Sequence, residues 1–172
     1  MVWLDRFALQ PHHIDLVMPR IAVITADFDV GAELTRLESG AGAVASFVGV
    51  VRGESRGRPL AALTLEHYPG MTEAALAAIA ETAMARWWLL DCVVIHRIGR
   101  LSPGARIVLA AASSAHRGDA LEATAFLIDW LKTDAPFWKR EDFADGGSAW
   151  VEARKDDHDT RDRWRTGRAT TT

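Results

Sequence analysis

Pro136 limits the fold more than any other residue, because a proline cannot continue a helix and this one follows a long helical pattern. Residues at helical spacing precede it, and they are Leu121, Ala125, Ile128 and Lys132. We therefore predict a helix over residues 117–133. After the proline, two strands are predicted over 137–142 and 149–154, joined by a glycine-rich segment.

The rest of the chain alternates short apolar runs with two further helical segments. Strands are predicted over residues 21–25, 42–51, 60–67, 92–98 and 106–112. Helices are predicted from the capping residues Asp27 and Asp29 to Ser39, and over 72–88. We expect 42–51 to be mostly buried and to form a hairpin with 60–67, and 92–98 to form a second meander with 106–112.

Composition indicates one globular domain. The chain has 172 residues, of which 49% are hydrophobic, enough for a substantial core. The net charge of −3 argues against nucleic-acid binding through overall positive charge. No apolar run reaches the roughly 20 residues of a membrane span, and the charged N-terminal arm over 1–20 is not a signal peptide. The single cysteine, Cys92, excludes an internal disulfide and fits the reducing cytoplasm.

Lys132 and Lys139 stand among large apolar residues on either side of Pro136. Partial desolvation lowers a lysine pKa towards the range where the amine transfers protons or attacks carbonyls. A turn at Pro136 would bring both lysines to one pocket. The alternative is that Lys132 extends past the core edge into solvent and that Lys139 pairs with Glu141 on the same strand face.

The segment from Ser113 to Arg117 leads from a strand into a helix. Free backbone N–H groups, the positive helix end and the arginine favour an anion such as a phosphate there. The alternative is that His116 and Arg117 only cap an ordinary helix. Arg52, at a strand end, is a second candidate for phosphate binding.

Other reactive side chains have plainer interpretations. His67 and His96 lack the spacing of a metal site, and structural hydrogen bonding is expected for both. Cys92 begins an apolar strand, so burial is favoured over a persulfide carrier. The chain has no Walker loop, dinucleotide glycine fingerprint or serine-hydrolase elbow.

Seven motifs occur in an ordered series, at residues 28–33, 42–52, 65–71, 96–99, 114–117, 131–141 and 150–154. This series resembles the MoaE family, the large, catalytic subunits of molybdopterin synthase. The resemblance covers residues 21–164, which implies one family domain there, an arm over 1–20 and a frayed tail over 165–172.

The resemblance implies an α/β hammerhead-type fold of the α+β kind, with mostly antiparallel sheets and flanking helices. It implies a homodimer with a small ubiquitin-like sulfur-carrier subunit on each protomer, giving a heterotetramer. The carrier's C-terminal Gly-Gly thiocarboxylate would supply two sulfurs to cyclic pyranopterin monophosphate, forming the molybdopterin dithiolene. No metal or cofactor is implied, and the carrier, not Cys92, would bring the sulfur.

The resemblance also implies roles for individual residues. The catalytic residues would be Lys132 and Lys139. The substrate-binding residues would be Arg52, His116, Arg117, Arg154, Phe47 and Met71, some of them supplied by a neighbouring protomer. The carrier-tail groove would be bounded by Phe137, Trp138 and Glu141. Two alternatives remain open: a non-catalytic adaptor that binds a ubiquitin-like carrier, and an enzyme acting on another phosphorylated metabolite without a carrier.

Overall fold

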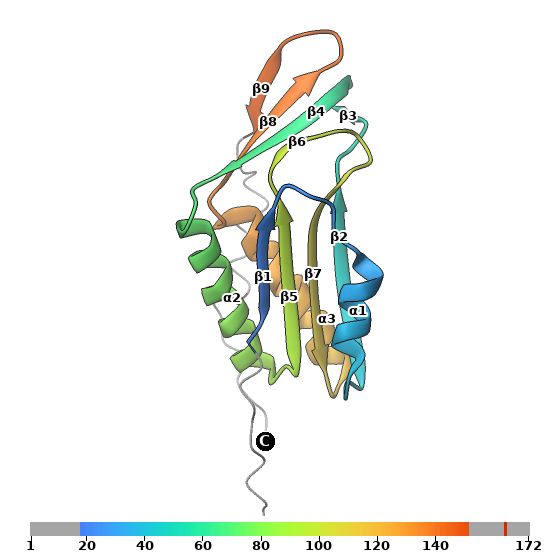
Figure 1. Cartoon of the computed structure of the whole chain (residues 1–172), viewed down its shortest axis with the longest axis vertical. Helices are drawn as coiled ribbons and strands as arrows, with labels where there is room; N and C mark the ends of the chain where they lie inside the picture. Colours follow the sequence, from blue (N-terminus) through green and yellow to red (C-terminus); the bar gives the residue numbers. More distant parts are fainter. Residues whose placement is uncertain (1–17, 152–163, 165–172) are drawn as a thin grey trace, which may run out of the picture.

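The computed structural model describes residues 18–151 and 164, which form three helices and nine strands (Figure 1). The helices are α1 (Val30–Glu38), α2 (Met71–Trp87) and α3 (Arg117–Thr133). The strands are β1 (Arg20–Ile24), β2 (Ala43–Val50), β3 (Glu54–Ser55), β4 (Arg58–His67), β5 (Asp91–Arg97), β6 (Gly99–Leu101), β7 (Arg106–Ser114), β8 (Phe137–Phe143) and β9 (Ser148–Val151). No helix in this part of the chain is long and apolar enough to cross a membrane.

The strands form two sheets (Figure 1). The four-stranded sheet has the order β1-β5-β7-β2, and only the β1–β5 pair is parallel. The five-stranded sheet has the order β3-β4-β8-β9, with β6 also pairing with β4, and all of its pairs are antiparallel. The predicted fold class of mostly antiparallel sheets with flanking helices is confirmed.

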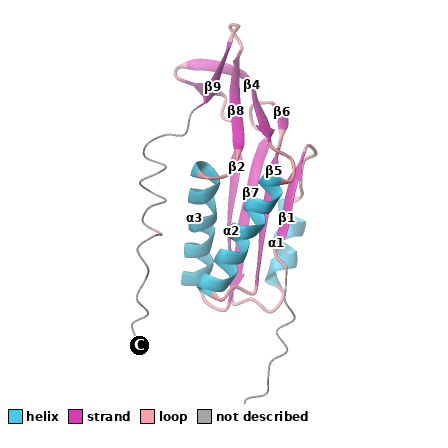
Figure 2. Ribbon diagram, turned by 90° about the vertical axis from the view of Figure 1, so that its left-hand side faces the viewer, coloured by secondary structure: helices cyan, strands magenta, loops and turns pink. Residues whose placement is uncertain are grey.

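Alternation along the central strands divides the core between the two faces of the four-stranded sheet. Cys92 and Val94 pack with α2 and α3 in the larger cluster. Val93 and Ile95, which point the other way, pack with Leu37 of α1. Figure 2 shows α2 and α3 side by side over the same face. The sequence consequently reads as continuous apolar runs in β5 and β7, because both of their faces are covered.

Residues 42–51 do form a strand, but its predicted environment was wrong. β2 lies at the edge of the four-stranded sheet, where Phe47 is 40% and Val50 is 52% exposed. It pairs with β7, and the predicted hairpin with 60–67 does not exist. The hairpin partner of β4 is instead the short β3, because Arg56 and Gly57 both adopt positive φ and close a two-residue turn.

Helix α3 begins and ends at the predicted residues, Arg117 and Thr133, but its buried side differs from the predicted one. Leu121, assigned to the apolar stripe, is 60% exposed. Ile128 of the predicted stripe is buried, and the other buried positions are Ala120, Ala123, Thr124, Phe126, Leu127 and Leu131. β2 is the edge strand, so within residues 18–151 no further strand extends beneath the Leu121 side.

Local signals at the other elements were accurate. Asp29 caps α1, since its carboxylate accepts a hydrogen bond from the N–H of Ala32. β5 and β7 form the expected antiparallel pair, as do β8 and β9. The predicted continuation of the last strand to residue 154 lies outside the described residues, as do most of the N-terminal arm and the tail.

Candidate active site

A cavity of about 440 Å³ lies where the two sheets meet, at the C-terminal end of α3. Its charged lining comes from the segment after β2, the end of α3 and strand β8. The polar and aromatic lining residues are Arg52, Lys132, Thr133, Phe137, Lys139 and Glu141. The structure therefore brings the two lysines and the arginine to one cavity within a single chain.

The turn at Pro136 and the alternation of β8 produce this convergence. Lys132 lies in the last turn of α3. The chain then reverses, and the N–H of Phe137 donates to the carbonyl of Ala135 at 2.7 Å. In a strand every second side chain shares a face, so Lys139 follows Phe137 into the same cavity.

Glu141 gives the cavity a buried acid among its cations. The residue is 6% exposed, and its Oε2 has no hydrogen-bond partner among the described residues. A buried carboxylate oxygen without a partner is costly unless a cation or a bound donor satisfies it. The cavity therefore combines a buried acid with the cations Arg52, Lys132 and Lys139.

Two imidazole rings lie against the aromatic wall of the cavity. The His96 ring stacks on Phe137 with centroids 3.8 Å apart, and the His67 ring lies at 6.5 Å. The expected structural hydrogen bond of His96 is present, between Nδ1 and the carbonyl of Arg97 at 2.8 Å. Burial lowers the pKa of His96 to about 4, so the ring is neutral at physiological pH. Sequence reasoning missed this contact with the cavity.

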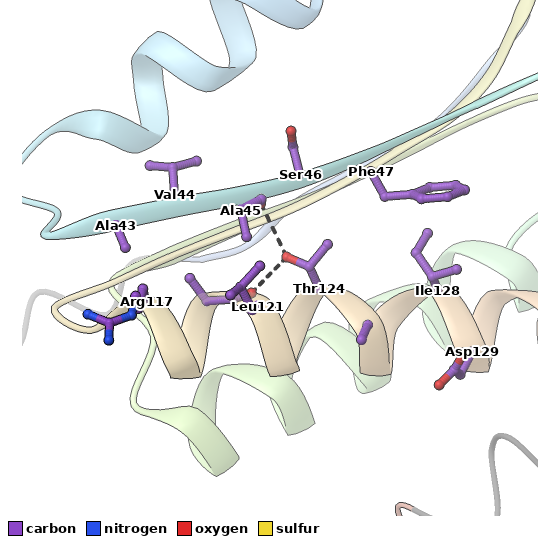
Figure 3. Close-up of a pocket in the computed structure, with 12 residues that line it drawn as sticks. Ala43, Val44, Ala45, Ser46, Phe47, Arg117, Leu121, Thr124, Ile128 and Asp129 are labelled. Atoms are coloured by element: carbon purple, nitrogen blue, oxygen red, sulfur yellow. Dashed lines mark hydrogen bonds between the residues drawn. The ribbon is translucent and has the colours of Figure 1, made fainter.

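A second hollow, a groove of about 570 Å³, runs between β2 and α3 (Figure 3). Phe47 and Arg117 line it together with the exposed Leu121. Thr124 connects α3 to β2 at the base of the groove. Its hydroxyl lies 3.2 Å from the carbonyl of Ala45 in β2 and 2.8 Å from that of Ala120 in α3. We call this hollow the β2–α3 groove. Its lining is mostly apolar.

His116 and Arg117 stand at the far end of α3 from the lysines. The helix has 17 residues and is therefore about 25 Å long. His116 is its N-cap, and the N–H of His116 donates to the hydroxyl of Ser114 at 3.3 Å. β2 starts close beside this turn, since a Cβ at Gly42 would lie 2.2 Å from the carbonyl oxygen of Ala115. Within one chain these residues do not join the lysine cavity.

The remaining candidates lie elsewhere. Met71 begins α2 and is 56% exposed, outside the residues that line the cavity. Trp138 is 51% exposed and points to the opposite face of β8 from its neighbours Phe137 and Lys139. Arg154 lies outside the described residues.

Cys92 is fully buried, as expected. Burial, and secondarily the charge of Asp91, raises the pKa of its thiol to about 12. A thiol of this kind is a poor nucleophile, because the thiolate is the reactive form. Among the described residues, no group of three or more histidine, cysteine or acidic side chains is arranged to hold a metal ion.

Comparison with known proteins gives a consistent result. A family model described as MoaE protein matches residues 23–134. The molybdopterin synthase catalytic subunit of Ralstonia nicotianae is 52% identical over 150 residues, covering 86% of this chain and 85% of that protein. The protein of the same name from Pseudomonas aeruginosa is 51% identical over 147 residues, covering 84% of this chain and 97% of that protein. The solved structure of the molybdopterin biosynthesis MoaE protein from Burkholderia ambifaria MC40-6 has a TM-score of 0.74 at 46% identity, covering 87% and 100%. This chain belongs to the MoaE family.

Proposed function

We propose that this protein is the catalytic subunit of a molybdopterin synthase. It would transfer two sulfurs from the C-terminal thiocarboxylate of a small carrier protein to cyclic pyranopterin monophosphate, forming the molybdopterin dithiolene. The observation that most strongly supports this is the convergence of Lys132, Lys139 and Arg52 on one cavity in a chain of this family. The reaction is a sulfur transfer in the cytoplasm.

The cavity has the groups that such a transfer requires. A cyclic phosphate needs cationic contacts, and Arg52 offers a guanidinium that binds phosphate oxygens in a bidentate manner. Sulfur addition and ring opening need proton transfer, for which Lys132 and Lys139 are the candidates. Their positive charges also stabilise negative charge that develops on the phosphate and on the acyl oxygen.

The carrier tail would enter the cavity along Phe137. An extended Gly-Gly tail fits a narrow passage because glycine has no side chain. Phe137 lines the cavity, whereas Trp138 stands on the opposite face of the same strand. We therefore assign Phe137 and Glu141 to the tail passage, and we place Trp138 on the outer surface, where it is available to the body of the carrier.

A homodimer formed through β2 would bring the distant cations to the cavity. Within the described residues β2 pairs only with β7, so its other edge is open beside the β2–α3 groove. β2 starts beside Ser114, close to His116, and ends two residues before Arg52. In a two-fold antiparallel pair, the start of one β2 lies opposite the end of its partner. Arg117 of one protomer would then approach Arg52 of the other.

The domain limits follow from the same assignment. We infer that residues 21–164 form the catalytic unit, and that 1–20 and 165–172 flank it. The match of the family model to residues 23–134 supports the N-terminal limit. Deletion of residues 1–17 is expected to leave sulfur transfer intact, because the match to the family model begins after them, at residue 23.

A reconstituted assay tests the proposed function. The purified chain is mixed with carrier thiocarboxylate and cyclic pyranopterin monophosphate, and dithiolene product is measured by conversion to a fluorescent pterin derivative. Product is expected only when chain, thiocarboxylate and substrate are all present. Carrier binding without product would instead identify an adaptor. Turnover of a phosphorylated substrate that is indifferent to the carrier would identify an enzyme of another class.

A further inference from the structure

The ring of Phe137 lies where the two sheets meet beside the cavity. Phe137 is the first residue of β8, in the five-stranded sheet, and it lines the cavity next to Lys139. His96 belongs to β5, in the four-stranded sheet. Their rings stack with centroids 3.8 Å apart and planes inclined by 18°. This stack is therefore a direct contact between the four-stranded sheet and the strand that carries Lys139.

The His96 ring is itself firmly held. The residue is 4% exposed, and its Nδ1 lies 2.8 Å from the carbonyl oxygen of Arg97. In the neutral ring, a hydrogen on Nδ1 donates to that carbonyl and fixes the ring plane. Burial keeps the ring neutral, and the positive charge of Lys139 contributes in the same direction. A neutral ring packs closely on a phenyl group without adding a cation to the cavity.

Other contacts hold the backbone of Phe137, so the loss of a ring contact would change the orientation of its side chain and not the path of the strand. The residue pairs with His67 across β4 and β8, and its N–H donates to the carbonyl of Ala135. Thr72 donates from its hydroxyl to the carbonyl of Pro136 at 3.4 Å. The closer of the two imidazoles, that of His96, therefore has the larger influence on the orientation of the phenyl ring.

We propose that His96 is a positioning residue that holds the Phe137 ring as the wall of the cavity, and so sets how reacting groups approach Lys139. The inference rests on the proposed function. Without the stack, the phenyl ring loses its closest aromatic contact and keeps the weaker restraint of the hydrophobic cluster and of His67. A misplacement of about 1 Å at a reacting centre costs up to about 100-fold in rate. His96 lies behind the ring, so its loss should lower kcat more than it raises KM.

Three substitutions separate the ring from its hydrogen bond. His96→Phe keeps a stacked ring and loses the hydrogen bond, whereas His96→Asn keeps a donor near the Nδ1 position and loses the ring. His96→Ala loses both. In the reconstituted assay, the Asn and Ala variants are expected to lose about tenfold in kcat with little change in KM for the pterin. His96→Phe is expected to keep at least about half of the wild-type kcat. The matched control is His67→Phe, which makes the same substitution at the imidazole that lies farther from Phe137.

A second measurement does not depend on turnover. The labelling rate of Lys139 by an amine-reactive reagent, relative to Lys132, is followed by mass spectrometry. The ratio should change in His96→Ala and His96→Asn and stay at the wild-type value in His96→Phe.

The inference is overturned if all three variants keep wild-type kcat and labelling. It is also overturned if kcat simply follows the melting temperature in every variant, His96→Phe included, because that pattern indicates a purely structural role. If the wild-type chain forms no product, the proposed function fails, and the labelling ratio still decides whether His96 positions the wall of the cavity.

Discussion

The two ends of helix α3 border two different hollows. At the C-terminal end, Lys132 lines a cavity whose other charged groups come from the same chain. At the N-terminal end, Arg117 lines the mostly apolar β2–α3 groove, beside an open strand edge. The turn after α3 and strand β8 enclose the cavity, whereas the groove lies between α3 and the edge strand β2.

This difference explains why the predicted site residues do not meet in one chain. The lysine cavity is assembled by a turn, a strand pairing and a sheet junction, all intramolecular. Among the described residues, the His116 end borders the open β2–α3 groove, which Arg117 and the exposed Leu121 line. In our proposal a second protomer covers the groove and carries these cations to the cavity. Three experiments test that contrast, and a fourth tests the junction between the sheets.

The largest effect is expected at the lysine end. Lys132→Ala and Lys139→Ala should each lower product formation at least about 100-fold, because proton transfer and charge stabilisation would both be lost. The reconstituted assay measures this, and circular dichroism checks the fold. Arg20→Ala is a matched control, since it removes a half-exposed cation paired with Glu33 far from the cavity. Near-normal turnover in Lys132→Ala would show that Lys132 has no catalytic role.

The next test asks whether the two ends act across protomers. Lys132→Ala and Arg117→Ala are expected to be nearly inactive separately, yet active when coexpressed as a mixture. If each site takes Lys132 from one chain and Arg117 from its partner, a mixed dimer has one intact site. Random pairing in a two-fold dimer then restores about a quarter of wild-type activity. If both residues act within one chain, the mixture stays inactive.

A charge in the β2–α3 groove should separate the protomers. Leu121→Asp places a carboxylate on a surface that is 60% exposed in the single chain, so the monomer fold should lose no more than about 1 kcal/mol. The dimer would have to bury that charge, which is costly. Analytical ultracentrifugation should show a shift towards monomer, with a parallel loss of activity. Trp88→Asn, at an exposed residue on the end of α2, should leave the mass unchanged.

The last test concerns pH and the junction between the sheets. The pKa of His96 is about 4 in the folded chain and about 6.5 in an unfolded one, so the unfolded state binds more protons between these values. Stability should therefore fall as pH decreases from 6.5 to 4, by on the order of 3 kcal/mol from this group. Urea unfolding at a series of pH values measures the loss. His96→Phe should show a shallower dependence, and an equal slope would mean that other groups dominate.

Several parts of the fold were predictable because their signals are local. Pro136 ends the α3 pattern, Asp29 caps α1, and the glycine-rich segment before β9 closes a hairpin, each through backbone constraints that act within a few residues. Lys139 was correctly placed on the same strand face as Glu141, since alternation along a strand depends only on sequence position.

Other parts were not predictable, because they depend on segments far apart in the chain. Residues 42–51 look like a buried strand, yet β2 is an edge strand whose exposure follows from the sheet order. Alternation puts Phe137 and Trp138 on opposite faces of β8, but which of the two lines the cavity depends on how β8 packs against the rest of the fold. The stack of His96 on Phe137 joins two sheets, and no spacing in the sequence reports it.

The sequence by itself determined the helices, most of the strands, the pair of lysines around a proline and the resemblance to the MoaE family. These depend on residue type and on short-range backbone geometry. Only the tertiary structure decided which cations share a cavity, which strand is left with an open edge, and that His96 supports the wall beside Lys139. Those facts depend on how two sheets pack against each other, which is set by contacts between residues distant along the chain.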